Sequence, residues 1–307
     1  MKPLLLLLLS TWSMPAASYF VTIAGLGGTP EYDAEFAKWA ADLDHDLKAN
    51  GPDARVLTLT AASATRQQIE RTFAGIAADA KPNDSLAVFL IGHGSFDGTD
   101  YKFNIPGPDI TAAELASLMN KIPAQRQLVV NMTSCSGASV ASLTRKNRIV
   151  IVSTKSGTEK NATVFARYWI DALRDPAADT DKNGTVSALE AFDYAQRKTA
   201  AYFESEKLLA TEHSMLNDTG EGSAVRDPKP ANGEGLLAAA FPIIRPETSI
   251  AKATDPAKQK LLAKKEDLEA KIDRLKYEKA ALSPEEYKQQ LTSLLLELAR
   301  TQAEIDH

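Results

Sequence analysis

The segment Leu86-Ala-Val-Phe-Leu-Ile-Gly-His-Gly-Ser95 is followed, after a linker and a helical pattern, by Gln127-Leu-Val-Val-Asn-Met-Thr-Ser-Cys-Ser-Gly-Ala138. Each segment begins as an apolar run of the length of a buried strand and ends in small residues around one reactive side chain. The first run ends at His93 and the second at Cys135, the only cysteine of the chain. We therefore expect a cysteine nucleophile and its histidine at neighbouring strand ends.

Apolar runs alternate with amphipathic patterns along most of the chain. The runs predict strands at residues 19–24, 55–60, 86–91, 128–132 and 149–153. The amphipathic patterns predict helices over 36–47, 69–76, 111–122, 161–174 and from 188 past 202, and two of them open with possible capping boxes, at Thr65 and Thr111. Parallel strands need crossover connections and are buried on both faces. The pattern thus predicts an α/β fold with a mainly parallel sheet, in which chemistry collects beyond the carboxyl ends of the strands.

Length and composition limit the classes of protein to consider. A chain of 307 residues with 44% hydrophobic and 24% charged residues can bury a full core, and it predicts one large domain with an appendage. The net charge of -5 provides no basic field of the kind that binds nucleic acid. Nucleic acid is therefore excluded as the expected partner.

Residues 1–18 have the pattern of a cleaved signal peptide. A lysine at position 2 precedes an unbroken leucine run, Leu4 to Leu9, and small residues follow at 16–18. The run is too short to span a bilayer, so a membrane anchor is the weaker alternative and no transmembrane segment is expected after cleavage. An exported, periplasmic or secreted protein with one cysteine cannot form an internal disulfide, which suggests a reactive thiol.

Composition divides the rest of the chain into three parts. Residues 19–222 form the expected main domain, and residues 223–256, rich in glycine, proline and small residues, form an irregular segment or linker. In residues 257–307, leucines recur every seven residues, and Ser283-Pro-Glu-Glu286 restarts a helix with an N-cap and a capping box. This tail is predicted to be a helical hairpin or coiled coil, through which copies of the chain could associate.

The chemistry of a cysteine enzyme explains the other residues around the pair. A thiol with a reference pKa of about 8.5 needs a base, and His93 can accept its proton and later protonate the departing amine. The backbone N–H of Gly94, with that of Cys135, could stabilise the negative oxygen formed during attack, and losing one such donor costs about 3 to 4 kcal/mol. The alternative is a buried, inert Cys135 beside a loop histidine. Only His213 rivals His93 as the base.

These motifs resemble the caspase and legumain superfamily, and its legumain-type branch most closely. The resemblance rests on Gly92-His-Gly-Ser95 after one apolar strand, on Phe103-Asn-Ile-Pro106, and on Ser134-Cys-Ser-Gly137 after the next strand, with Cys135 lying 42 residues after His93. It covers residues 19–204. It implies a caspase-like three-layer α/β sandwich and a cysteine endopeptidase or transpeptidase, with Cys135 as nucleophile and His93 as general acid and base.

The substrate pocket departs from the legumain pattern. Thr133 and Ser136 stand where legumains carry acidic residues, which puts asparagine specificity in doubt. The legumain residue that orients the histidine aligns near Gly27, and the basic pocket residue aligns near Asp33, which could instead favour a basic P1 side chain or be a solvated helix N-terminal carboxylate. The positions of the family's groove wall are Thr154, Lys155 and Ser156, of which the lysine would repel a basic P1 residue.

A second motif predicts a metal site. Asp179-Thr-Asp-Lys-Asn-Gly-Thr-Val-Ser-Ala-Leu-Glu190 matches the twelve-residue calcium loop, with glycine at position six and glutamate at position twelve. The expected ligands are side-chain oxygens and one carbonyl, from Asp179, Asp181, Asn183, Thr185, Ser187 and Glu190. An acidic turn is the alternative. We expect a structural or activating calcium, since no residue of the loop can act as a nucleophile.

Together these patterns predict an exported, calcium-binding cysteine endopeptidase that cleaves peptide bonds in peptide or protein substrates through a thioester acyl-enzyme. Two alternatives stay open. One is a catalytically silent, calcium-binding envelope scaffold, and the other is a transpeptidase or transamidase of the same fold.

Overall fold

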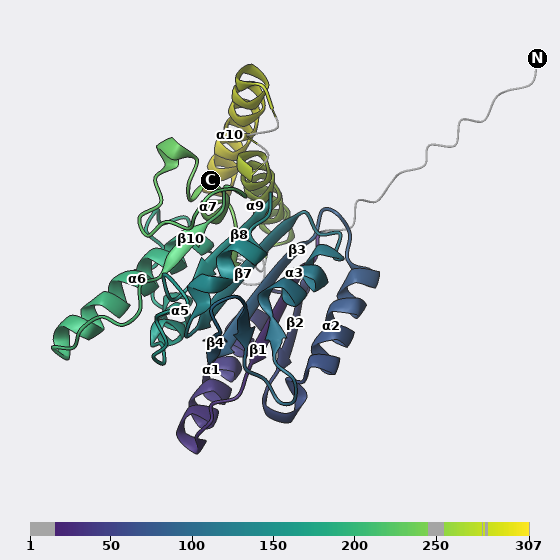
Figure 1. Ribbon diagram of the computed structural model, residues 1–307. Helices are drawn as coiled ribbons and strands as arrows, with labels where there is room; N and C mark the ends of the chain where they lie inside the picture. Colours follow the sequence, from purple (N-terminus) through teal and green to yellow (C-terminus); the bar gives the residue numbers. More distant parts are fainter. Residues whose placement is uncertain (1–15, 245–254, 278, 280–281, 307) are drawn as a thin grey trace, which may run out of the picture.

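The computed structural model describes residues 16–244, 255–277, 279 and 282–306 (Figure 1). Most of the predicted signal peptide lies outside these residues. The end of that segment takes part in the fold, because Ser18 pairs with Ala54 and Ser85, and the Ala17 N–H donates to Asp84 Oδ1 at 2.8 Å. The predicted boundary at Ser18 thus coincides with the start of the first strand, and export stays a prediction.

A six-stranded sheet in the order β10-β8-β7-β3-β1-β2 forms the centre of the molecule. Its strands are β1 (Ser18–Ala24), β2 (Ala54–Leu59), β3 (Ser85–Gly92), β7 (Arg126–Thr133), β8 (Arg148–Val152) and β10 (Met215–Asn217). The first five are parallel and β10 is antiparallel to β8. The predicted mainly parallel α/β sheet is therefore confirmed.

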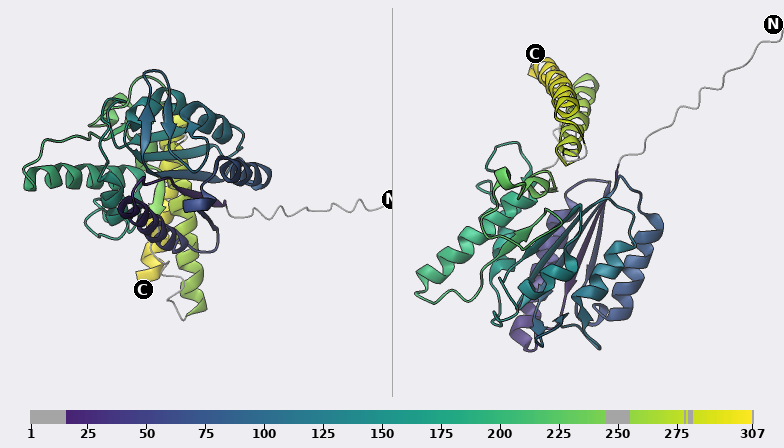
Figure 2. Two further views of the ribbon diagram at one scale, coloured as in Figure 1. Left: turned by 60° about the horizontal axis from the view of Figure 1, so that its bottom comes forward. Right: turned by 45° about the horizontal axis from the view of Figure 1, so that its top comes forward.

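Helices cover both faces of the sheet (Figures 1 and 2). The core on one face contains residues of α1 (Pro30–Lys48), α5 (Phe165–Ala172) and α6 (Ala188–Ser205). The core on the other face contains residues of α2 (Arg66–Asp79), α3 (Ala112–Asn120) and α4 (Val140–Leu143). Alternate residues of β3 enter opposite cores, Phe89 the first and Val88 the second, as the pleat of a strand requires. The result is three layers.

Two of the helix starts follow the predicted caps. Thr111 and Glu114 form a complete capping box at α3, and the Thr65 side chain accepts from the Gln68 N–H at α2. In contrast, α5 begins at Phe165, later than the predicted residue 161.

A small antiparallel sheet beyond the end of β3 was not predicted. It consists of β4 (Gly94–Phe96), β5 (Tyr101–Phe103) and β6 (Ile110–Thr111). Strands of two or three residues are too short to show a period in the sequence. This small sheet buries Tyr101 and Phe103 against the second core and lies directly beside the predicted active site.

The segment expected to be irregular contains regular structure. It includes a short 3-10 helix (Pro230–Asn232), α7 (Leu236–Ala239) and β11 (Pro242–Ile244), and β11 pairs antiparallel with β9 (Val186–Ser187). Phe241 and Ile243 are buried in the first core. The pairing joins segments far apart in the sequence, so local composition gave no sign of it. Residues 245–254 of the predicted linker lie outside the described residues.

The tail forms two helices, α9 (Pro256–Tyr277) and α10 (Pro284–Asp306), which pack together as the hairpin prediction requires. Lys264 Nζ lies 3.1 Å from Glu297 Oε1 across the pair, and the Ser283 side chain accepts from the Glu286 N–H. The hairpin lies near α7, at the end of the sheet opposite β4 (Figures 1 and 2). It is therefore remote from His93 and Cys135. Self-association through it stays a prediction.

Candidate functional site

The register of β3 against β7 brings the two reactive residues to one edge of the sheet. Gly92 pairs with Thr133, so His93 and Cys135 follow the last paired residues of adjacent parallel strands. Cys135 has a φ of 58° and precedes a turn of 3-10 helix from Ser136 to Ser139. This left-handed conformation turns the chain sharply at the strand end.

The His93 ring is fixed by the loop after β1 and by α1. Its Nε2 lies 3.1 Å from the Gly27 carbonyl oxygen, and its ring packs edge-on against Tyr32 and Phe36, with centroids 5.0 and 5.2 Å away. Because a carbonyl only accepts, Nε2 carries the proton in this contact and the neutral ring keeps Nδ1 as its acceptor. Asp33 Oδ1 accepts from the Gly27 N–H at 2.7 Å, so this carboxylate anchors the peptide that orients the histidine.

The Cys135 thiol is buried. Its residue is only 1% exposed, and the Phe96 backbone N–H donates to the thiol. Burial raises the pKa of the thiol, and the positive charge of Lys160 offsets only part of this effect. Within the described chain, no hydrogen bond joins the His93 ring to Cys135. The neutral thiol is therefore the favoured form in this conformation, and the dyad stays a prediction.

Both candidate oxyanion donors are engaged. The Gly94 N–H donates to Ser134 Oγ at 3.1 Å, and the Cys135 N–H donates to the Glu159 carbonyl oxygen at 2.8 Å. Position 94 has no space for a side chain, since a Cβ there would lie 2.5 Å from the Ser134 carbonyl oxygen. In this conformation neither N–H is available to a substrate.

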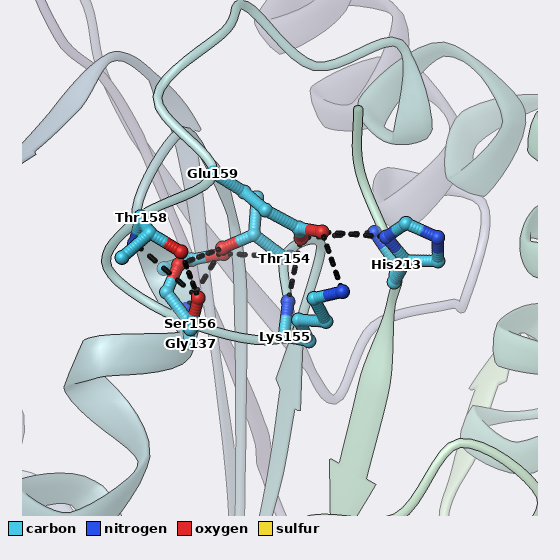
Figure 3. A network of polar contacts seen from close by, with 8 residues as sticks. Gly137, Thr154, Lys155, Ser156, Thr158, Glu159 and His213 are labelled. Carbon is cyan, nitrogen blue, oxygen red and sulfur yellow. Dashed lines mark hydrogen bonds and ion pairs between the residues drawn. The ribbon is translucent and has the colours of Figure 1, made fainter. Parts of the chain in front are cut away.

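The predicted groove-wall residues pack over the cysteine loop (Figure 3). Thr154 is buried and its Oγ1 accepts from the Gly137 N–H at 2.9 Å. Lys155 is exposed, and the Ser156 hydroxyl lies 2.7 Å from that of Thr158. The Asp33 side chain is directed at its own loop, as described above. The roles of these residues toward a P1 side chain stay predictions.

Glu159 and His213 form a pair that the sequence did not indicate. His213 Nδ1 lies 2.5 Å from Glu159 Oε1, and the His213 N–H donates to Oε2 at 3.2 Å (Figure 3). His213 had been considered only as a rival base. The two residues are 54 positions apart in irregular segments, so neither periodicity nor a motif could link them.

Glu212 has a buried carboxyl group that contacts the residue before α5. It is 4% exposed, its Oε1 accepts from the Val164 N–H at 2.8 Å, and among the described residues its Oε2 has no hydrogen-bond partner. Burial raises the pKa of this carboxyl to about 7, and the charge of Glu159 adds to the shift. The bond to Val164 explains why α5 starts after the predicted residue.

The predicted metal loop gathers three carboxylates. Oxygens of Asp179, Asp181 and Glu190 all lie within 4.8 Å of one another. The Asp179 carboxylate also accepts from the Asn183 and Gly184 N–H groups, at 3.1 and 2.9 Å. Val186 and Ser187 of the loop form β9, whose pairing with β11 holds the loop against the first core, and the last three residues of the loop begin α6.

The charges of this loop favour a cation. Burial raises the pKa of Asp181, and the neighbouring Glu190 and Asp179 carboxylates raise it further. At Glu190 burial also acts to raise the pKa, but hydrogen bonds from Ser187 and Thr180 outweigh it and the pKa is lowered. Asn183 Oδ1 accepts from the Thr185 N–H, and Ser187 Oγ donates to Glu190 Oε2. Crowded oxygen donors of this kind fit a hard divalent cation such as calcium.

One protein family matches part of the chain. A sequence model of the peptidase C13 family matches residues 65–202, a range that includes His93, Cys135 and the acidic loop. No curated protein matches the chain.

Three solved structures resemble the fold with high probability but low sequence identity. Protein GSU0716 from Geobacter sulfurreducens has a TM-score of 0.44 at 12% identity, over 72% of this chain and 97% of that one. The Drosophila initiator caspase Dronc has a TM-score of 0.45 at 10% identity, over 73% and 84%. Caspase-1 from Spodoptera frugiperda has a TM-score of 0.45 at 13% identity, over 68% and 89%.

Replacing Glu212 with Gln should change how stability depends on pH. A carboxyl with a folded-state pKa of about 7 binds its proton more tightly than in the unfolded chain, where the reference pKa is about 4.3. Wild-type stability therefore falls as the pH rises between these values and levels off above the higher one. Glu212→Gln should lack this loss and exceed the wild type by about 4 kcal/mol at pH 8.

Urea unfolding of both proteins from pH 4 to pH 8 measures the difference, and the exposed Glu206→Gln is the matched control for removal of one carboxylate. A constant difference between Glu212→Gln and the wild type across this range would contradict the prediction.

Proposed function

We propose that the chain is a cysteine endopeptidase of the caspase and legumain type, with Cys135 as nucleophile and His93 as general acid and base. The observation that carries the proposal is the parallel register of β3 and β7, which puts both residues at one sheet edge. The match to the peptidase C13 family spans both strands and supports a function of the cysteine-peptidase type.

The proposed reaction proceeds in two halves. The Cys135 thiolate attacks the carbonyl carbon of the scissile peptide bond, and the electron pair of that carbonyl moves to its oxygen. The imidazolium of His93 then protonates the departing amine, because an unprotonated amide nitrogen is too poor a leaving group. Water attacks the resulting thioester with His93 as base, releases the carboxylic acid and regenerates the thiol.

The hydrogen bond from Nε2 of His93 to the Gly27 carbonyl has a role in this scheme. It fixes one tautomer of the neutral ring, with the proton on Nε2. Nδ1 is then the atom that exchanges protons. Asp33 would act through Gly27 as a positioning residue for the base.

The sealed thiol favours the scaffold alternative. A cysteine that is 1% exposed and has a raised pKa is what a catalytically silent member of this fold would retain. The two functions differ in one property, namely whether Cys135 forms a thioester with a peptide. A transpeptidase would form the same thioester and resolve it with an amine in place of water.

We further propose that the loop of residues 179–190 binds calcium. Asp179, Asp181 and Glu190 would supply most of the charge, and Asn183, Ser187 and the Thr185 carbonyl the remaining oxygens. The cation would neutralise three carboxylates that now repel one another, and it would hold the loop at the start of α6. Its role is structural.

The proposed setting is outside the cytoplasm, on the basis of the leucine run near the N-terminus. Among the described residues, no helix has the length and apolar character needed to cross a membrane. Peptides or proteins in that compartment would be the substrates.

Loss of either reactive residue should abolish peptide cleavage. Cys135→Ala removes the nucleophile and should leave only background cleavage of a positional-scanning peptide library, whereas His93→Ala should lower kcat/KM by about 10² to 10⁴. The exposed His45→Ala is the matched control and should keep full activity. Cleavage that persists unchanged in Cys135→Ala would refute the proposed nucleophile.

Calcium should raise the melting temperature of the folded chain. At a calcium concentration 100 times the Kd, the gain in unfolding free energy is about 2.7 kcal/mol. Asp181→Asn should remove most of this gain, because it removes one of the three carboxylates of the proposed site, while the exposed Asp53→Asn should keep it. Thermal unfolding with calcium and with a chelator measures both. An equal calcium response in the wild type and Asp181→Asn would argue against the site.

A further inference from the structure

Residues 154–159, here named the strap, leave the end of β8 and cross the cysteine loop (Figure 3). The first end of the strap is fixed by Thr154. Its Oγ1 accepts from the Gly137 N–H at 2.9 Å and lies 3.1 Å from Ser136 Oγ, which also accepts from the Thr154 N–H. The strap thus begins bonded to the two residues that follow the cysteine.

The other end of the strap reaches Cys135 itself. The Glu159 carbonyl oxygen accepts the Cys135 N–H at 2.8 Å. This N–H is one of the two donors that the proposed reaction needs for the oxyanion. A backbone carbonyl of the chain therefore occupies the donor that a substrate carbonyl would use.

Two glycines let the strap lie directly on the cysteine loop. A Cβ at Gly137 would lie 2.2 Å from the Ser156 nitrogen, and a Cβ at Gly157 would lie 2.3 Å from the Phe96 ring. The backbone N–H of Phe96 in turn donates to the thiol. The thiol is enclosed between β4 and the strap, which accounts for its 1% exposure.

The Glu159 side chain secures the strap from the far side. Its carboxylate accepts from the Lys155 N–H at 2.8 Å within the strap, and it pairs with His213 Nδ1 at 2.5 Å outside it. The Glu159 side chain is 10% exposed and that of His213 is 25% exposed, so solvent screens the pair only in part. His213 lies just before β10, the antiparallel neighbour of β8. It is the only side chain outside the strap with which the described structure gives the Glu159 carboxylate a hydrogen bond.

We propose that the strap is an autoinhibitory segment and that the pair of Glu159 and His213 is its latch. In the closed state the strap covers the thiol and takes the Cys135 N–H. Release of the latch lets residues 154–156 withdraw, and these are the positions that resemble the groove wall of legumains. The proposal rests on the proposed peptidase function, since inhibition has meaning only if Cys135 reacts with a substrate.

Alkylation of Cys135, the only thiol of the chain, by iodoacetamide tests the latch without any assumption about substrates. Glu159→Gln and His213→Gln, each in the full chain, should react at least about tenfold faster than the wild type, as expected from loss of one charge-assisted hydrogen bond. The exposed His45→Gln is the matched control and should react at the wild-type rate. Equal rates in all four proteins would overturn the proposal.

A measurement on the wild type covers the case in which a variant fails to fold. Opening of the strap should expose both the Cys135 thiol and the Cys135 amide, because the Glu159 carbonyl holds that amide in the closed state. The equilibrium constant for opening obtained from the alkylation rate should therefore equal the constant obtained from hydrogen exchange of this amide. A thiol that reacts far faster than its own amide exchanges would overturn the proposal.

Peptide cleavage assayed in the same proteins separates this proposal from the one on which it rests. Faster alkylation of the latch variants without any cleavage would support the strap and refute the peptidase. Cleavage that depends on Cys135, with equal alkylation rates in every variant, would support the peptidase and refute the strap.

Discussion

The hydrogen bond from the Cys135 N–H to the Glu159 carbonyl holds the strap closed over the candidate nucleophile, and the proposed regulation depends on it. It joins the end of β7 to the segment after β8, and it can form because the two strands are parallel neighbours whose carboxyl ends meet. The same topology that assembles a reactive pair at one edge of the sheet thus also brings a backbone carbonyl to its donor. In the proposed function, both the reactivity of the pair and its suppression would arise from this one arrangement of strands.

Two ionisable groups near this bond are buried, which is unfavourable for their charged forms. Glu212 is buried with one oxygen unpaired, next in sequence to the histidine that holds Glu159. Such a group destabilises the fold at neutral pH unless something compensates it. The closed thiol is similarly unfavourable for chemistry, because burial opposes the thiolate. The left-handed φ of 58° at Cys135 adds a strained backbone position, and such positions cluster at functional sites.

Much of the framework could be predicted from sequence, because it rests on local patterns. Apolar runs gave the parallel strands, and the Thr111 cap gave the start of α3. The placement of His93 and Cys135 at adjacent strand ends followed from the same runs. What could not be predicted depends on contacts between distant segments: the pairing of β9 with β11, the bond from Glu212 that delays α5, and the pairing of Glu159 with His213. No residue type at a fixed spacing in the sequence predicts such contacts.

In the proposed function, Cys135 forms a thioester with a peptide once the strap is released. The most direct measurement of this step is mass spectrometry of Glu159→Gln after brief mixing with activated peptide esters and acid quenching, followed by mapping of the acylated residue. We expect an acyl adduct on Cys135 that is more abundant than in the wild type and that disappears slowly in the His93→Ala background. Rapid alkylation of the same thiol without any acyl adduct from a broad peptide set would contradict this expectation.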